Sequence, residues 1–164
     1  MVCSAPLLTG CSGSGTDGSA APDPLLTPAE IAGGRVTPEI LWKFARLGEV
    51  RCAPDQSTLL FAVTRYNLEE NSGKKQLYTL PVAGGNPVAL MPVEGAYSNP
   101  RWHPVNGKIW YLNDVNGENQ LFEMNPDGSE SKQISSITGG VSGFEIDPSG
   151  KRILYLKRVK MLPD

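Results

Sequence analysis

Pro100-Arg101-Trp102-His103-Pro104, followed by Ile109-Trp110-Tyr111, is the stretch of sequence that decides the fold, because its pattern occurs three times in the chain. An apolar triplet that ends in an aromatic residue begins five residues beyond Pro54, Pro104 and Pro148, and turn-forming residues lie in between. The other two triplets are Leu59-Leu60-Phe61 and Ile153-Leu154-Tyr155. Each copy therefore predicts two short strands joined by a tight turn, which is a β-hairpin.

Two of the three copies continue into a second hairpin. In both, a strand pattern that begins with glutamine is followed by a glycine-containing turn and a weaker strand. The strand patterns are Gln76-Leu77-Tyr78-Thr79-Leu80 and Gln120-Leu121-Phe122-Glu123-Met124, the turns are Gly84-Gly85 and Asp127-Gly128, and the weaker strands cover 87–91 and 132–137. Successive units start roughly 50 and then roughly 44 residues apart, a length that is typical of a four-stranded β-propeller blade.

The apolar triplets indicate how the units pack. Because three consecutive positions are apolar, both faces of these strands need cover, and stacking each blade between two neighbours provides it. We therefore predict an all-β protein: a partial β-propeller of two four-stranded blades plus the first hairpin of a third, with short N-terminal helices. An open β-sandwich is the alternative. The incomplete propeller is predicted over 49–164, with blades at about 49–97, 98–140 and a partial one at 141–164.

The number of blades predicts that this chain is a fragment. Propellers have four to eight blades, and the chain supplies two and the first hairpin of a third. An isolated array of this kind leaves a blade face without its neighbour, and stacked repeats below about three are marginally stable. We therefore expect poor solubility or self-association.

A short helical lead-in is predicted over 25–48. Thr27-Pro28-Ala29-Glu30 is a capping box with proline at the first helical position, and Thr37-Pro38-Glu39 opens a second helix. The apolar residues of the second helix have the spacing of one helical face; they are Ile40, Leu41 and Phe44, with Trp42 interpreted as a packing anchor. We expect the helices to cover one side of the first blade.

Leu8-Thr9-Gly10-Cys11 has the pattern of a bacterial lipobox, in which two small residues precede a cysteine whose thiol receives the lipid. The glycine- and serine-rich segment 12–19 then suits a flexible tether. No Lys or Arg precedes Cys11, and the stretch before it is short for a signal peptide. The prediction is a truncated lipoprotein-type signal and flexible linker over 1–24, with lipidation at Cys11, export, and a periplasmic or membrane-anchored location in a bacterium. A disordered N-terminus with a chance match is the alternative.

Composition argues against a nucleic-acid partner, a membrane span and a zinc site. The formal net charge of −2 lacks the basic footprint of a nucleic-acid-binding protein, and no apolar run approaches the roughly 18 residues of a membrane span. Cys3, Cys11 and Cys52 do not form the spaced pairs of a zinc site, and His103 is the single histidine. We therefore predict no metal and no cofactor, and any membrane attachment depends on Cys11.

The segment from Pro100 to Pro104 with its triplet resembles the P-x-W-S-P-D-G-x-x-I-x-F blade repeat, which occurs in the Tol system's periplasmic propeller protein and in the prolyl oligopeptidase family of serine peptidases. Asp147-Pro148-Ser149-Gly150-Lys151 resembles the S-P-D-G-K form of that repeat, with Ser149 in place of the usual aspartate. Thr37-Pro38-Glu39-Ile40-Leu41-Trp42-Lys43-Phe44 favours the peptidases, because it resembles the helix that leads into the first blade of bacterial dipeptidyl-peptidase and acylaminoacyl-peptidase members. Tyr66-Asn67-Leu68-Glu69-Glu70-Asn71 is similar to a first-blade loop of such proteins, and the resemblance covers roughly 37–160.

This resemblance implies a two-domain enzyme in which the propeller covers the mouth of an α/β-hydrolase domain and restricts access to short peptides. In the family, the hydrolase domain carries a Ser nucleophile in a G-x-S-x-G turn, with Asp and His later in the chain. No G-x-S-x-G occurs in these 164 residues, so we assign no catalytic residue. We interpret His103 as a strand-end residue without a catalytic role. Glu69-Glu70 is interpreted as a solvated loop tip rather than the acidic pair that holds a substrate's ammonium group in dipeptidyl peptidases.

The expected function is therefore the substrate-gating propeller part of an exported serine exopeptidase. Its substrates would be short peptides, and the hydrolase domain and remaining blades would lie outside this chain. The alternative is a non-catalytic, Tol-like propeller lipoprotein that binds a cell-envelope partner. The two differ in whether the gene continues beyond Asp164 into a hydrolase domain.

Overall fold

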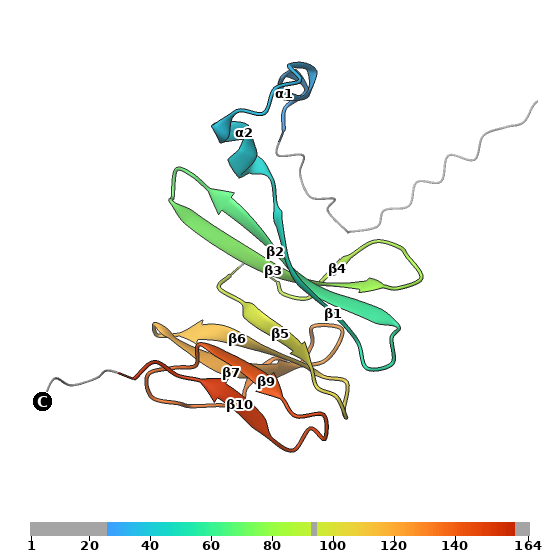
Figure 1. Ribbon diagram of the computed structural model, residues 1–164, viewed down its shortest axis with the longest axis vertical. Helices are drawn as coiled ribbons and strands as arrows, with labels where there is room; N and C mark the ends of the chain where they lie inside the picture. The colour runs from blue at the N-terminus through green and yellow to red at the C-terminus, as the bar shows by residue number, and fades with distance from the viewer. Residues whose placement is uncertain (1–25, 93–94, 160–164) are drawn as a thin grey trace, which may run out of the picture.

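The computed structural model describes residues 26–92 and 95–159, so Cys11 and the predicted signal lie outside the described residues. Within these residues the strands form two four-stranded sheets and one hairpin, all antiparallel (Figure 1). In chain order the elements are α1 (Pro28–Ala32), α2 (Pro38–Lys43), β1 (Arg46–Cys52), β2 (Thr58–Asn67), β3 (Ser72–Pro81), β4 (Val88–Ala89), β5 (Ser98–Trp102), β6 (Ile109–Val115), β7 (Glu118–Met124), β8 (Lys132–Gln133), β9 (Gly143–Ile146) and β10 (Ile153–Leu156). The predicted fold class is confirmed, and β1 begins ahead of the proposed domain boundary at 49.

The three sequence copies occupy equivalent places in the sheets. We call β1–β4 blade 1, β5–β8 blade 2 and β9–β10 the third hairpin, because the strands follow one another in that order within each sheet. The first residue of every apolar triplet pairs with the last residue of the preceding strand. These pairs are Cys52 with Leu59, Trp102 with Ile109, and Ile146 with Ile153. The hairpins predicted around Pro54, Pro104 and Pro148, which we call the register prolines, are therefore present with equivalent strand pairing in all three units.

Each unit has two apolar faces, because successive side chains of a strand point to opposite sides of the sheet. We call the face that packs on the preceding unit the leading face and the face that receives the next unit the trailing face. In blade 2 the leading face contains Ile109, Tyr111 and Phe122, and the trailing face contains Trp110, Leu112 and Leu121. In blade 1 the trailing face contains Leu60, Ala62 and Leu77.

Two hydrophobic cores lie between the units rather than inside any one of them. The first joins the trailing face of blade 1 to the leading face of blade 2, where Leu60, Leu77 and Ile109 are completely buried. The second joins the trailing face of blade 2 to Val141 and Phe144 of the third unit. Full burial of one such side chain contributes about 1.5–3 kcal/mol, so the stacking of units stabilises the fold.

Both helices begin at their predicted caps. In α1 the hydroxyl of Thr27 accepts a hydrogen bond from the Glu30 backbone N–H at 3.3 Å, and the Glu30 carboxylate accepts one from the Thr27 backbone at 2.8 Å. In α2 the hydroxyl of Thr37 accepts from the Ile40 backbone at 3.3 Å. The ammonium of Lys43 then donates to Glu30 at 2.7 Å and connects the two helices.

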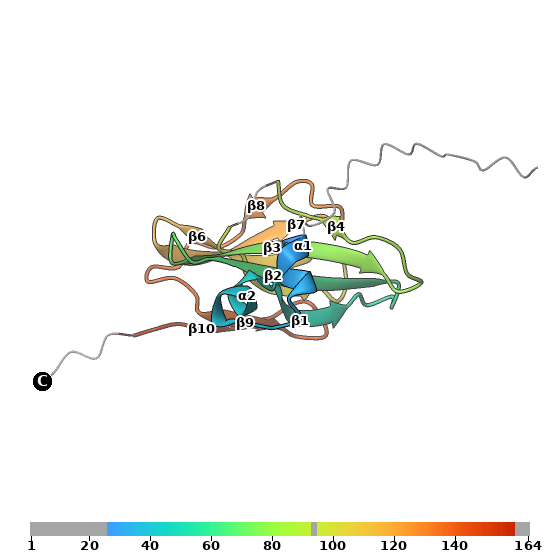
Figure 2. The same ribbon diagram turned by 90° about the horizontal axis from the view of Figure 1, so that it is seen from above.

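The position of the helices differs from the prediction. α2 contacts β2, and seen from above the helices lie over the end of blade 1 rather than along one of its sides (Figure 2). Ile40 is buried, whereas Leu41 and Phe44 are exposed. Phe44 does not continue the apolar helical face, because the helix ends at Lys43 and Phe44 is already extended. Trp42 packs edge-on against Tyr66 of β2 at a centroid distance of 5.4 Å, which fits its interpretation as an anchor.

Candidate functional site on the inner strands

The first strands of successive units lie side by side, and four charged side chains meet on them. They are Glu49 and Arg51 of β1, Arg101 of β5 and Glu145 of β9, which we call the inner-strand cluster. β5 contacts both β1 and β9, which places Arg101 between the other two strands. Its side chain is 11% exposed, far less than those of its two glutamate partners.

Arg101 donates hydrogen bonds to both neighbouring strands. Its Nη1 lies 2.7 Å from Glu49 Oε2, and its Nε and Nη2 lie 3.1 and 2.6 Å from the two carboxylate oxygens of Glu145. Arg51 also pairs with Glu49 and lies 3.8 Å from Glu145. The two-pronged contact of a guanidinium with one carboxylate is among the strongest and most directional ion pairs in proteins.

The cluster consists of two cations and two anions that compensate each other. The hydrogen bond from Arg101 lowers the pKa of Glu145 below its ordinary value, so this carboxylate is ionised at neutral pH. An ionised carboxylate held by an arginine is a poor proton acceptor. The chemistry that the cluster supports is therefore electrostatic: it ties three units together and presents fixed charges along the inner strands.

Sequence reasoning missed this cluster, although a signal was present. Arg51, Arg101 and Glu145 each lie three positions before their register proline, so a charged residue occupies the same repeat position three times. The pairing itself could not be predicted, because residues at equivalent positions of different units come together only when the units stack.

His103 follows the last residue of β5 and is 8% exposed. Its Nδ1 accepts backbone hydrogen bonds from Val105 at 3.4 Å and Asn106 at 3.3 Å, which closes the turn between β5 and β6. The turn of the third hairpin packs on its ring, since a Cβ atom added at Gly150 would lie 2.7 Å from His103 Cε1. These contacts give His103 a role in packing, and its lack of a catalytic role stays a prediction.

The acidic pair and the cysteines are separate from the inner-strand cluster. Glu69 and Glu70 are exposed at the turn between β2 and β3, where Glu70 accepts a hydrogen bond from Ser72 and pairs with Lys74 at 3.7 Å. Cys52 is a free, exposed thiol at the end of β1. Within residues 26–92 and 95–159, no group of three or more His, Cys, Asp or Glu side chains could hold a metal ion.

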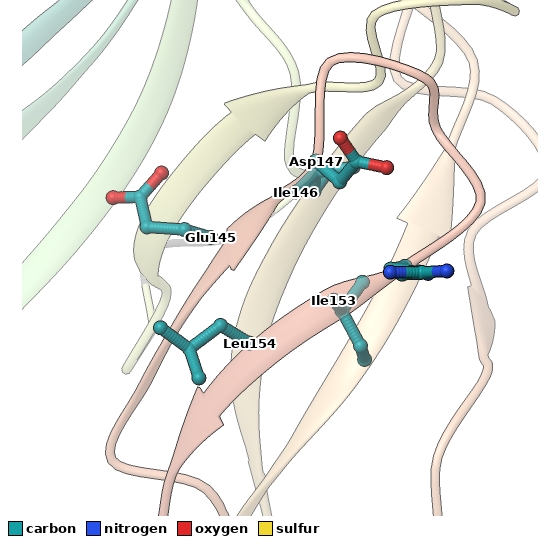
Figure 3. Close-up of a pocket in the computed structure, with 6 residues that line it drawn as sticks. Glu145, Ile146, Asp147, Ile153 and Leu154 are labelled. Atoms are coloured by element: carbon teal, nitrogen blue, oxygen red, sulfur yellow. The ribbon is translucent and has the colours of Figure 1, made fainter.

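A shallow hollow of about 360 Å³ lies on the third hairpin (Figure 3). It is lined by Glu145, Ile146, Asp147, Arg152, Ile153 and Leu154. All of these residues belong to one hairpin, so the hollow has no opposing wall. Glu145 and Leu154 lie on the same side of the hairpin in the close-up, and Leu154 is 70% exposed. The hollow marks an uncovered blade face rather than an enclosed substrate site.

Curated relatives of the chain are peptidases. The chain is 30% identical over 126 residues to dipeptidyl-peptidase 5 of Porphyromonas endodontalis, and 31% identical over 143 residues to dipeptidyl-peptidase 5 of Porphyromonas gingivalis. These matches cover 77% and 87% of this chain but 18% and 21% of the relatives, so the chain spans about a fifth of their length. No family model matches the chain.

Solved structures add the fold. The acylaminoacyl peptidase of Pyrococcus horikoshii matches 70% of this chain and 17% of its own, with 20% identity and a TM-score of 0.58. The β-propeller domain of the Trilobed protease from Pyrococcus furiosus matches 71% of this chain and 35% of its own, with 18% identity and a TM-score of 0.54. The chain fits a β-propeller part of a prolyl oligopeptidase family peptidase.

The family resemblance predicted from the blade repeat and the Thr37–Phe44 segment is confirmed. The inner-strand cluster therefore lies on the first strands of successive propeller blades. Among the described residues of the propeller, neither helix is long and apolar enough to cross a membrane. Cys11 falls outside that part, so its lipidation stays a prediction.

Proposed function

We propose that this chain is the substrate-gating propeller part of an exported serine exopeptidase that hydrolyses short peptides. The observation that carries the proposal is the 31% identity to a dipeptidyl-peptidase along 87% of the chain. The length of the relatives supports a catalytic α/β-hydrolase domain elsewhere in the longer protein, because this chain corresponds to about a fifth of them. The chain contains no G-x-S-x-G nucleophile motif, so we assign it control of substrate access rather than the chemical step.

The stacking of the units supports a gating role physically. A propeller part restricts access only if its inner rim keeps a fixed width. Arg101 joins β1, β5 and β9 through the Glu49 and Glu145 carboxylates, and two cores between the units oppose their separation. A rim held in this way would admit a thin, extended peptide and reject a folded protein.

The proposal is tested on the product of the gene that contains this sequence. A fluorophosphonate probe, which labels activated serines, should modify the complete product, and the product should release dipeptides or single acylated residues from short synthetic peptides. The 164-residue chain should remain unlabelled. An unlabelled complete product that binds an envelope protein would overturn the proposal in favour of a non-catalytic propeller lipoprotein.

Export and lipidation are proposed on the Leu8-Thr9-Gly10-Cys11 pattern alone. Expression of the complete gene in a bacterium fed with a radiolabelled fatty acid should give a labelled protein in the membrane fraction. Cys11→Ser should abolish the label, and Cys52→Ser should retain it because Cys52 is the last residue of β1. Equal labelling of both variants would contradict the lipobox.

A further inference from the structure

His103 is the single histidine of the chain, and its ring accepts the hydrogen bonds that close a turn. Its Nδ1 lies 3.4 Å from the backbone nitrogen of Val105 and 3.3 Å from that of Asn106. Because a backbone N–H can only donate, Nδ1 must present a lone pair rather than a proton. The proton of the neutral ring is then on Nε2. The turn between β5 and β6 therefore requires an uncharged imidazole.

The third hairpin uses a carboxylate for the same contact. His103 and Asp147 both precede a register proline, so they occupy the same repeat position. Asp147 Oδ1 accepts a hydrogen bond from the Ser149 backbone N–H, two residues further on, as His103 Nδ1 does from that of Val105. Aspartate side chains lose their charge only in strong acid, whereas histidine side chains gain a proton between about pH 8 and about pH 5. Blade 2 therefore has a turn acceptor of the type that titrates near neutral pH.

The His103 ring also connects blade 2 to the third hairpin. It packs on Trp110 of β6 with the ring centroids 5.1 Å apart, and the residue is buried. It contacts the turn at Gly150 as well, where a Cβ atom would lie 2.7 Å from His103 Cε1 and 3.2 Å from Nε2. A ring confined in this way cannot turn over without displacing Gly150. Loss of the Nδ1 acceptor therefore affects the contact between the two units as well as the β5–β6 turn.

The carboxylates on the elements around the ring already have other partners. The charged side chains of these elements are Lys108, Glu123, Asp147, Lys151 and Arg152. Glu123 pairs with Lys108 at 3.1 Å and accepts a hydrogen bond from Trp110 Nε1 at 3.0 Å. Burial raises the pKa of Glu123, but the hydrogen bonds outweigh it and hold this pKa below its ordinary value. Asp147 also accepts from the Ser149 hydroxyl, so neither carboxylate is free to stabilise a protonated ring.

We propose that His103 is a pH-sensitive joint between blade 2 and the third hairpin. With an uncharged ring, Nδ1 closes the β5–β6 turn and the ring supports the turn at Gly150. When the ring gains a proton from solvent, Nδ1 becomes a donor that faces two other donors, so the turn opens and the contact at Gly150 loosens. The joint responds to mild acid, above the pH range in which carboxylates are protonated. It rests on the contacts of His103 and does not depend on the proposed peptidase function.

The test is hydrogen–deuterium exchange with mass spectrometry on the product of the gene that contains this sequence. Protection of backbone amides is measured at about pH 8 and about pH 5.5, relative to the intrinsic exchange rate at each pH. Peptides that cover 103–108 and 147–152 should lose protection in acid, by about two- to tenfold for each hydrogen bond that is lost. The peptide that covers β3 in blade 1 should keep its protection, because β3 contains no histidine.

His103→Asn is the matched variant, because an asparagine Oδ1 accepts backbone hydrogen bonds at the same place and does not titrate. Its protection over 103–108 should be equal at the two pH values, and circular dichroism verifies that it is folded. Unchanged protection of the unaltered protein in acid would overturn the proposal, as would an equal loss in folded His103→Asn. If His103→Asn does not fold, Asp147→His replaces it. That variant should enlarge the loss over 147–152 in acid, and an unchanged loss would then overturn the proposal.

Discussion

Arg101 and Glu145 form a two-pronged ion pair that joins β5 to β9 with donor–acceptor distances of 3.1 and 2.6 Å. Isolated ion pairs at a surface contribute little, because water screens them and both side chains lose freedom. This pair differs from them in that Arg101 is 11% exposed and also binds Glu49 on a third strand. The pair therefore belongs to a network that spans three structural units.

Arg101→Met should lower the free energy of unfolding by about 1–3 kcal/mol, because hydrogen bonds to charged groups are lost while the aliphatic part of the side chain is kept. Urea unfolding of dilute protein measures the change. Lys74→Met is the matched control, since Lys74 and Glu70 are both 55% exposed and lie 3.7 Å apart. Its effect should be within about 0.5 kcal/mol. Equal effects of the two substitutions would show that the Arg101 network does not stabilise the fold.

Acid should weaken the contribution of Glu145 to stability. The hydrogen bond from Arg101 holds the pKa of Glu145 in the folded protein below its ordinary value of 4.5, which the unfolded chain retains. The stabilisation is therefore complete well above pH 4.5 and is lost as the pH falls below 4.5 through the folded-state pKa. The difference in urea midpoint between the unchanged chain and Glu145→Gln should shrink over that range. A difference that stays constant with pH would contradict the assignment.

Gln76 and Gln120 make equivalent contacts in the two blades, buried in blade 1 and part-buried in blade 2. The Gln76 amide donates to the carbonyl of Met91 at 2.8 Å, and the Gln120 amide donates to the carbonyl of Ile137 at 2.9 Å. Gln76→Met, which keeps the size of the side chain, should cost about 1–3 kcal/mol, because that carbonyl loses its donor in the interior. Gln133→Met on the exposed strand β8 should change the unfolding free energy much less. If Gln76→Met and Gln133→Met had the same free energy of unfolding in urea, the hydrogen bond from Gln76 to Met91 would have no role in stability.

Gly150 should tolerate substitution less well than Gly107, although both have a positive φ, of 70° and 66°. That backbone conformation alone costs a residue with a Cβ roughly 1–2 kcal/mol. At Gly107 a Cβ would meet open space, whereas at Gly150 it would lie 2.7 Å from His103 Cε1. Gly150→Ala should therefore lower the melting temperature more than Gly107→Ala. In a His103→Ala background, the difference in melting temperature between Gly150→Ala and Gly107→Ala should become smaller. An unchanged difference would contradict the contact between Gly150 and the His103 ring as its cause.

Much of the fold follows from local chemistry. The register prolines, the apolar triplets and the glutamine-led strands predicted the four-stranded units, because alternation along a strand and turn residues act within a few positions of the chain. The caps at Thr27 and Thr37 predicted both helix starts for the same reason. The placement of α2 could not be predicted in this way. It depends on the contact between Trp42 and Tyr66, residues that are distant in sequence.

The sequence by itself determined that this protein is built from repeated antiparallel hairpins related to those of peptidase propellers. Tertiary structure alone decided which face of each unit is covered, that Arg101 binds Glu49 and Glu145, and that His103 lies beneath the turn at Gly150. The partners of Arg101 are 52 and 44 residues away in the chain. The spacing of side chains along one strand specifies its two faces. Which other strand comes to lie against each face depends on how the units stack, and nothing local to either strand encodes it.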